Sequence, residues 1–527
     1  MDTYNNNGTH TVPLKIKIMC SILIWFPIVF PFITIHYFPH ATIIYNIIIS
    51  IYIIISHLLT YGTCFTIFMK QQKIIYEFFR SKNWSEKKNN YIENRRIGIN
   101  NSNEEILHMV IIPIYKENPN IVENTLKSLI KQNVPMIIGF GLEERETNSN
   151  VKYDDIIKKY ENHFIKIIKT IHPINLKNEI PGKASNCNYN ARQLIKFYEE
   201  NHMNLKFLYN HVMVTVCDCD SIWVNDYFLY LNYLCKQNNM KNFNYIAYVP
   251  NITNFQHFSL NHILSNWVSV LRSIGTHGHF YFLGYVRAFV SEYHIPLELL
   301  KRIDFWDSDL VQEDIHMCNK LAILDEKRFV VKHTFLPCDN QIPTDINSFI
   351  GSFQILWNQT SRWNLFLYEF YYLFYELLLN IFNIKRYENF RTNTSKILVQ
   401  LINNYENLFF FGMCPISNNI FWFFYLHIWK EHYLSSTVHH LLNNIQPWFI
   451  MIHLFLGILY AAFIWNASYE HTKDRSYNWI KFTFFLLGFI PLPSLFFICQ
   501  AINITNAWIQ TLKSNQTHSE SAPKVLF

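Results

Sequence analysis

Val212-Met-Val-Thr-Val-Cys-Asp-Cys-Asp-Ser221 is a β-branched, apolar run that ends in two aspartates one residue apart. Such a run predicts a buried strand. Because side chains alternate along a strand, Asp218 and Asp220 are expected to point to the same side. There their oxygens suit Mg²⁺ or Mn²⁺ bound against a diphosphate. Like charges repel, so a structural role is less favoured than a metal site.

Two further β-rich runs, 108–114 and 136–140, lie in a polar stretch from about 100 to 345, where short strands alternate with helix-like segments. This alternation predicts an α/β domain with a mostly parallel sheet. Ligands of such sheets bind at the carboxyl ends of the strands. Glu143 and Glu144 follow the second run. Either suits hydrogen bonds from a base or ribose, although a solvated acidic turn explains the pattern equally well.

Three other clusters suit the same chemistry. Gly182-Lys-Ala-Ser-Asn-Cys-Asn188 precedes a helical pattern, and a Gly-Lys step at a helix start can hold a phosphate. Gln312-Glu-Asp-Ile-His316 offers a general base, or merely a helix cap, and its histidine is interpreted as structural. Gln359-Thr-Ser-Arg362-Trp363 offers an arginine for phosphate and a tryptophan for a sugar face, or a membrane-interface anchor.

The composition favours a membrane protein with a polar domain. The chain has 527 residues, of which 50% are hydrophobic and 16% charged, against about 25% charged in soluble domains. This disfavours disordered chains and ordinary soluble enzymes. The net charge of +6 comes from basic residues beside apolar segments. They form no basic stripe, so no nucleic-acid partner is expected.

Apolar runs at about 18–38 and 43–69 are each long enough to cross a core of about 30 Å, which predicts a transmembrane hairpin over 1–70. Basic residues follow in a linker, 71–104, and the link between the two runs carries no charge. By the positive-inside rule, the polar domain and the N-terminus are cytosolic. The scattered cysteines then read as free thiols.

Apolar runs return at about 365–382, 408–429, 447–465 and 480–502. The first carries Glu369 and Glu376 on one helical face, which predicts an interfacial amphipathic helix over 365–384. The others predict a C-terminal transmembrane region over 385–505, with four or five spans in all and a polar tail over 506–527. The protein is thus predicted to be a multi-pass protein of the plasma membrane, endoplasmic reticulum or Golgi.

In this order, the clusters between about 105 and 365 resemble the membrane-integrated family 2 glycosyltransferases, a group that includes cellulose, chitin and hyaluronan synthases and ceramide glucosyltransferases. The resemblance implies a Rossmann-like α/β GT-A domain over 105–364, inserted between α-helical transmembrane segments. It also implies inverting transfer of a sugar from a nucleotide sugar, expected to be UDP-linked, to a glycan or lipid acceptor, with Mg²⁺ or Mn²⁺ as cofactor.

The resemblance also implies residue roles. Asp314 would be the general base, and Asp220 with Asp218 would bind the metal. The acceptor would contact Trp363 and Gln359. The donor would contact Glu143 or Glu144, Lys183, Asn186, Asp218 and Arg362.

The sequence departs from the family pattern in three places. Gly-Leu-Glu-Glu-Arg-Glu146 replaces an aspartate motif, Gln312 replaces a common threonine, and a small-residue acceptor segment has no match. Three hypotheses therefore stay open: synthesis of a glycan with translocation, transfer of one sugar to a lipid, and a catalytically degenerate membrane scaffold.

Overall fold

The computed structural model describes residues 12–79, 106–146, 149–174, 176, 179–201, 211–257, 260–279, 281–282, 285–323, 329–364, 367–382, 394–406, 420–422, 455, 458–459 and 492–513.

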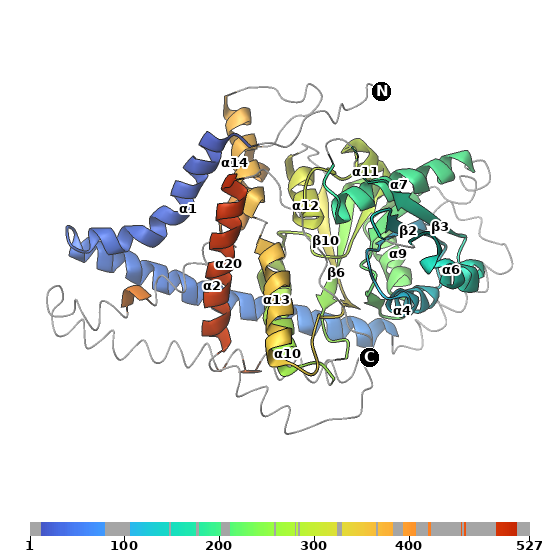
Figure 1. The fold of residues 1–527 in the computed structure, drawn as a ribbon, viewed down its shortest axis with the longest axis horizontal. Helices are drawn as coiled ribbons and strands as arrows, with labels where there is room; N and C mark the ends of the chain where they lie inside the picture. The colour runs from blue at the N-terminus through green and yellow to red at the C-terminus, as the bar shows by residue number, and fades with distance from the viewer. Residues whose placement is uncertain are drawn as a thin grey trace.

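An eight-stranded sheet forms the centre of the polar domain, with the order β3-β2-β1-β4-β9-β6-β10-β5 (Figure 1). The first four strands in this order, β3 to β4, are parallel to one another, and β6 is parallel to β10. Strands β9 and β5 run antiparallel to their neighbours. The structure thus has the α/β class expected from the sequence, with a mixed sheet. The strands are β1 (Ile106–Pro113), β2 (Met136–Glu143), β3 (Lys166–His172), β4 (His211–Val216), β5 (Ile222–Trp223), β6 (Ile246–Thr253), β9 (Tyr293–Pro296) and β10 (Val330–Asp339).

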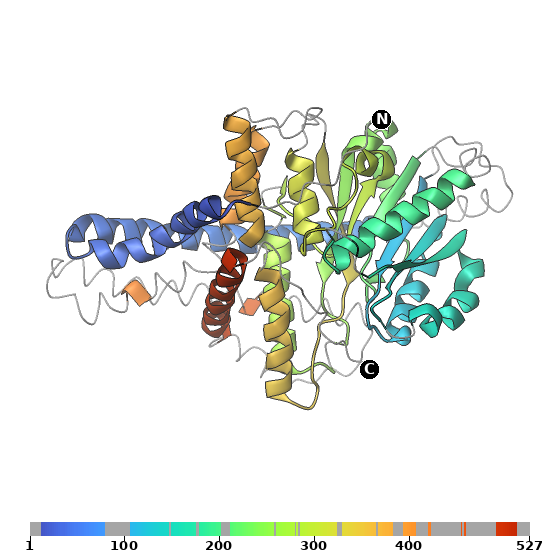
Figure 2. The same ribbon diagram turned by 45° about the horizontal axis from the view of Figure 1, so that its top comes forward.

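Helices cover both faces of this sheet (Figures 1 and 2). In β1, Val110 and Ile112 enter the core on one face, while Met109 and Ile111 enter the core on the other. Burial on both faces explains why the strands read as continuous apolar runs. The first face is covered by α4 (Pro119–Ile130), α6 (Asp154–Tyr160) and α9 (Tyr227–Gln237), and the second by α7 (Lys183–Glu200), α11 (Leu297–Arg302) and α12 (Glu313–Ile323).

Shorter elements connect these layers. They are α5 (Ser149–Lys152), the 3₁₀ helices η2 (Glu161–His163) and η3 (Met240–Tyr245), the π-helices η1 (Ile75–Phe79) and η4 (Gly275–His279), and a two-stranded ribbon of β7 (Tyr281–Phe282) and β8 (Tyr285–Val286).

Two glycines let α7 sit directly on β2. A Cβ added at Gly141 would lie 2.1 Å from Oδ1 of Asn186, and one at Gly139 would lie 2.2 Å from Oδ1 of Asn190. The Asn186 amide also donates to the carbonyl oxygen of Gly141, at 2.8 Å. This contact fixes the start of α7, where Lys183 lies.

Gly141→Ala is therefore expected to destabilise the protein by about 1–3 kcal/mol, because the added methyl group overpacks this contact. Thermal unfolding of the purified protein measures the effect. Gly62→Ala is the matched control, since a Cβ there has no atom within 4 Å. Equal melting temperatures for both variants would contradict the prediction.

Two helices of the described chain have the length and composition of membrane spans: Leu14–Thr34 and Pro39–Phe78, with mean hydropathies of 2.2 and 2.0. They correspond to α1 (Leu14–Thr34) and to α2 (Pro39–Ile74) with η1. The later part of α2 packs on the polar domain, where Asn251 donates to Gln71 at 2.7 Å. Two apolar helices thus lie where the hairpin is predicted, while their insertion in a membrane, a cytosolic side and a multi-pass topology stay predictions.

Four further helices contribute no residue to the two cores of the sheet: α10 (Ile263–Ile274), α13 (Phe349–Trp363), α14 (Leu367–Ile381) and α15 (Thr394–Glu406). The predicted interfacial segment corresponds to α14, whose Glu369 and Glu376 are both buried. The predicted spans 408–429 and 447–465 lie almost entirely outside the described residues. Of the predicted span 480–502, the structure describes only the end, as the start of α20 (Leu492–Lys513).

Candidate active site

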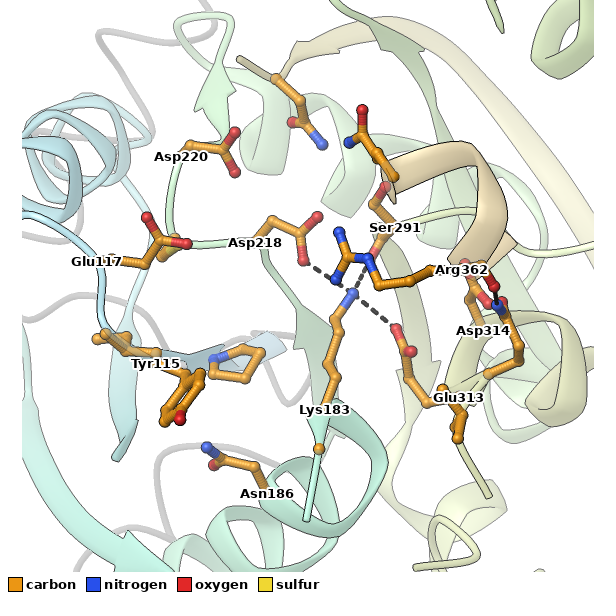
Figure 3. Close-up of a pocket in the computed structure, with 18 of the residues that line it drawn as sticks. Tyr115, Glu117, Lys183, Asn186, Asp218, Asp220, Ser291, Glu313, Asp314 and Arg362 are labelled. Carbon is orange, nitrogen blue, oxygen red and sulfur yellow. Dashed lines mark hydrogen bonds and ion pairs between the residues drawn. The ribbon is translucent and has the colours of Figure 1, made fainter. Parts of the chain in front are cut away.

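A cavity of about 250 Å³ opens at the carboxyl ends of the parallel strands (Figure 3). Segments that follow β1, β2, β4 and β10 meet there with the starts of α7 and α12, the segment before β9 and the ends of α10 and α13. The sequence-predicted residues that line it are Glu143, Lys183, Asn186, Asp218, Asp220, Asp314, Gln359, Arg362 and Trp363. Glu144 is not among the residues that line it.

The glutamates at the end of β2 and in the turn after it make different contacts. Glu143 lines the cavity and pairs with Arg145, which also lines it. Glu144 instead accepts a hydrogen bond from the backbone N–H of Ile174, at 2.9 Å. Glu146 anchors the neighbouring loop by accepting from the backbone N–H of Lys116, at 2.9 Å. Of the two glutamates that the sequence offers as ligands of a base or ribose, only Glu143 therefore lies at the cavity.

The two aspartates after β4 both border the cavity but differ in burial. The Asp218 side chain is 25% exposed, whereas Asp220 is buried and accepts from the backbone N–H of Gln341, at 2.9 Å. The described residues contain no group of three or more His, Cys, Asp or Glu side chains suited to a metal. Mg²⁺ is usually bound by one or two carboxylates with substrate phosphates and water. Two cavity-lining aspartates fit such a shared site.

Lys183 bridges two acidic side chains that line the cavity (Figure 3). Its Nζ lies 2.8 Å from Oδ1 of Asp218 and 2.6 Å from Oε1 of Glu313, and it donates to the carbonyl oxygen of Ser291 at 3.2 Å. Burial opposes the charge, but the two carboxylates outweigh it and raise the Lys183 pKa well above its usual value. The ammonium group is therefore already neutralised by the protein.

The start of α12 brings a second pair of acids to the cavity. Glu313 and Asp314 both line it. Burial raises the pKa of the Asp314 carboxyl group, and the nearby Lys183 opposes the shift. A carboxylate with a raised pKa accepts a proton more readily than an ordinary aspartate. Gln312 joins this helix to α13 by donating to the carbonyl oxygen of Arg362, at 2.8 Å.

The end of α13 presents unused hydrogen-bonding atoms. Oε1 of Gln359 and Nε of Arg362 are buried, and neither has a hydrogen-bond partner among the described residues. Buried polar atoms normally have partners, so an acceptor and a donor are available here for a ligand. Asn503 of α20 holds this end of α13 by bonding Ser361 and Thr360, at 2.8 Å and 3.0 Å.

Arg272 on α10 is a site residue that sequence reasoning missed. Its guanidinium donates to Asn254 at 2.9 Å and to Ser291 at 3.2 Å, and it lies 4.5 Å from the centre of the Trp363 ring. Within the described chain, no carboxylate lies at ion-pair distance from it. Burial lowers its pKa, yet an arginine stays protonated in proteins. The cavity thus holds a cation with only neutral direct partners.

Other missed residues line the cavity as well. Arg145 lies inside the Gly-Leu-Glu-Glu-Arg-Glu146 stretch and Tyr115 directly follows the run 108–114, so their neighbours were the available signal. Arg272, Ser291 and Asn340 lie in segments without a motif. Only the fold brings these three to the site.

No known family model matches the chain, and no curated protein sequence does. Among solved structures, the chain is similar to the mannosyltransferase PcManGT from Pyrobaculum calidifontis, in complex with GDP-Man and Mn²⁺. The match covers 87% of this chain and 100% of that one, with 11% identity and a TM-score of 0.40.

Proposed function

We propose that this protein is a membrane-bound, inverting glycosyltransferase that uses a nucleotide sugar. The observation that carries the proposal is the meeting of Asp218, Asp220, Asp314 and Arg362 around one cavity, although they come from three separate regions of the sequence. Two carboxylates for a metal, one for a proton and a guanidinium for a phosphate are the groups that this reaction needs. The resemblance to family 2 glycosyltransferases supports the same assignment.

The donor diphosphate would lie between Asp218 and α13. A bound Mg²⁺ or Mn²⁺ would be held by Asp218 and Asp220 and would supply positive charge next to the phosphates. Arg362 would donate hydrogen bonds to the leaving diphosphate, and Arg272 would add a second positive charge beside it. Donors fixed where negative charge develops lower the barrier to bond cleavage.

The acceptor hydroxyl would approach from the side of α12. Asp314 would remove its proton as the oxygen attacks the anomeric carbon, and the bond from that carbon to the diphosphate would break on the opposite face. The Trp363 ring suits the apolar face of a sugar, and Gln359 would accept from a sugar hydroxyl. The acceptor is proposed to be a glycan or a lipid at the cytosolic membrane surface.

Release of nucleoside diphosphate tests the proposal. The detergent-purified full-length protein is incubated with a panel of nucleotide sugars, membrane lipid extract and Mg²⁺ or Mn²⁺. We expect release from one donor, which stops when a chelator removes the metal. Folded protein that binds nucleotides but never releases them from a sugar would favour the degenerate scaffold.

Arg272→Met is expected to slow turnover about 100-fold, because a fixed positive charge beside the leaving group is lost. Arg272→Lys should recover only part of the rate, since an ammonium group cannot hold Asn254, Ser291 and the Trp363 ring together. Steady-state kinetics measure both variants. Lys158→Met is the control, because Lys158 is exposed on α6. A wild-type rate for Arg272→Met would contradict a role of Arg272 in stabilising the leaving group.

A further inference from the structure

We propose that the donor carries guanine, and that Glu143 and Arg145 read the edge of this base. The inference rests on the proposed function, because it names the nucleotide that the same cavity binds. The resemblance to family 2 glycosyltransferases implied UDP, but the residues after β2 have the chemistry of a guanine site.

The recognition pair lies at the wall of the cavity. Glu143 ends β2 and is 3% exposed, and its Oε2 is paired with Nε of Arg145. The Arg145 guanidinium lies over the Tyr115 ring, 4.0 Å from its centre. All three residues line the cavity. Tyr115 thus restrains the guanidinium, and Glu143 holds it from the side.

The remaining hydrogen-bonding groups of this pair are available to a ligand. Within the described part of the chain, the side chains of Glu143 and Arg145 hydrogen-bond only to each other. Arginine carries five N–H donors and a carboxylate has two acceptor oxygens. A base edge lying along the pair can therefore meet an N–H donor of Arg145 and then the two oxygens of Glu143, in the order donor, acceptor, acceptor.

This order matches one nucleobase fully. The edge of guanine presents the O6 acceptor, the N1–H donor and the N2–H donor. Uracil presents an acceptor, a donor and a second acceptor, so its last oxygen would face a carboxylate oxygen. Adenine and cytosine each place a ring-nitrogen acceptor beside an amino donor and leave the second carboxylate oxygen without a donor. Arginine with guanine O6 and a carboxylate with base amino groups are also common pairings in nucleic-acid recognition.

Burial makes a mismatch costly. The Glu143 side chain is almost fully removed from solvent, so an unmatched base oxygen beside it is not rescued by water. Sites built to hydrogen-bond a ligand reject analogues that lack the matching group much more strongly than apolar pockets do. We therefore expect a clear order of affinities among nucleoside diphosphates.

Titration calorimetry with GDP, UDP, ADP and CDP tests the inference on the purified full-length protein with Mg²⁺. We expect GDP to bind at least about tenfold more tightly than UDP. Equal affinities, or a preference for UDP, would overturn the guanine assignment while leaving the transferase proposal standing. If none of the four nucleotides binds, both the guanine assignment and the transferase proposal are contradicted. GDP binding without release from any guanosine-diphosphate sugar would support the guanine site and contradict the transferase.

Glu143→Gln sharpens the test. Glutamine replaces one acceptor oxygen with an N–H donor, which changes the order to donor, acceptor, donor and matches uracil. GDP affinity should fall and UDP affinity should hold or rise, so the ratio of the two moves toward UDP. Arg145→Lys is the second variant, expected to weaken both nucleotides. Glu161→Gln, an exposed change on η2, should leave the ratio unchanged. An unchanged ratio in folded Glu143→Gln protein would contradict the assignment.

Discussion

Replacing Asp314 with asparagine is expected to reduce turnover by a factor of about 10²–10⁴, while donor binding changes little. Asparagine keeps the size of the side chain but cannot accept the proton of the acceptor hydroxyl. Asp314 lines the cavity without a direct ion pair to Lys183, whose partners are Asp218 and Glu313. The donor side should therefore stay intact, and kinetics and calorimetry on the same preparation separate the two effects.

The pH dependence of turnover is a second test of Asp314 as the general base. Burial raises the pKa of Asp314, and a general base works only when deprotonated. The rate should therefore fall as the pH drops through a value above the roughly 4 of an ordinary aspartate. Asp155→Asn, an exposed change on α6, should show the wild-type rate and profile. An Asp314→Asn protein with full activity would exclude Asp314 as the base.

His316→Asn is expected to lower the free energy of unfolding by about 3–5 kcal/mol, the cost of breaking a buried ion pair by removing one partner. His316 lies two residues beyond Asp314 on α12. Its Nε2 is 2.8 Å from Asp307 and its Nδ1 is 3.0 Å from Glu369 of α14. Both carboxylates are buried and would lose this cation.

The protonation of His316 determines the pH range over which it stabilises the fold. Burial alone would lower its pKa, but Glu369 and Asp307 outweigh burial and raise the pKa to about 10. A raised native pKa gives stability that is complete below the unfolded value of about 6.5 and is lost as the pH rises toward 10.

Chemical unfolding at pH 6 and at pH 10 measures the effect. The gap between the wild type and His316→Asn should be larger at pH 6. His163→Asn, at an exposed histidine, is the control. A gap that does not depend on pH would show that His316 is neutral in the folded protein.

Much of the domain could be predicted because its strands are buried on both faces. The apolar runs that contain Ile112 and Val214 leave little choice but strands, and the polar residues after them mark the strand ends. The antiparallel β9 could not be predicted, since its four residues, Tyr293–Pro296, give no periodic signal. Its place between β4 and β6 depends on contacts between distant segments.

Charge patterns were harder to interpret. The glutamates of α14 suggested a face toward water, whereas the structure buries them and pairs Glu369 with His316. A sequence shows the spacing of charges but not their partners. The same limit applies to Arg272, which belongs to no motif and reaches the cavity only because α10 packs beside α13. By contrast, Asp218, Asp220 and Arg362 lie in short sequence patterns whose chemistry is local, and the structure places all three at the cavity.

Sugar incorporation measured together with nucleotide release tests the central claim most directly. The full-length protein is given a donor labelled in its sugar, with Mg²⁺ or Mn²⁺ and membrane lipid extract, and both products are quantified. We predict one labelled sugar recovered on an acceptor for each nucleoside diphosphate released, with both lost in Asp314→Asn. Nucleotide release with the label found only in free sugar would mean hydrolysis and would contradict glycosyl transfer.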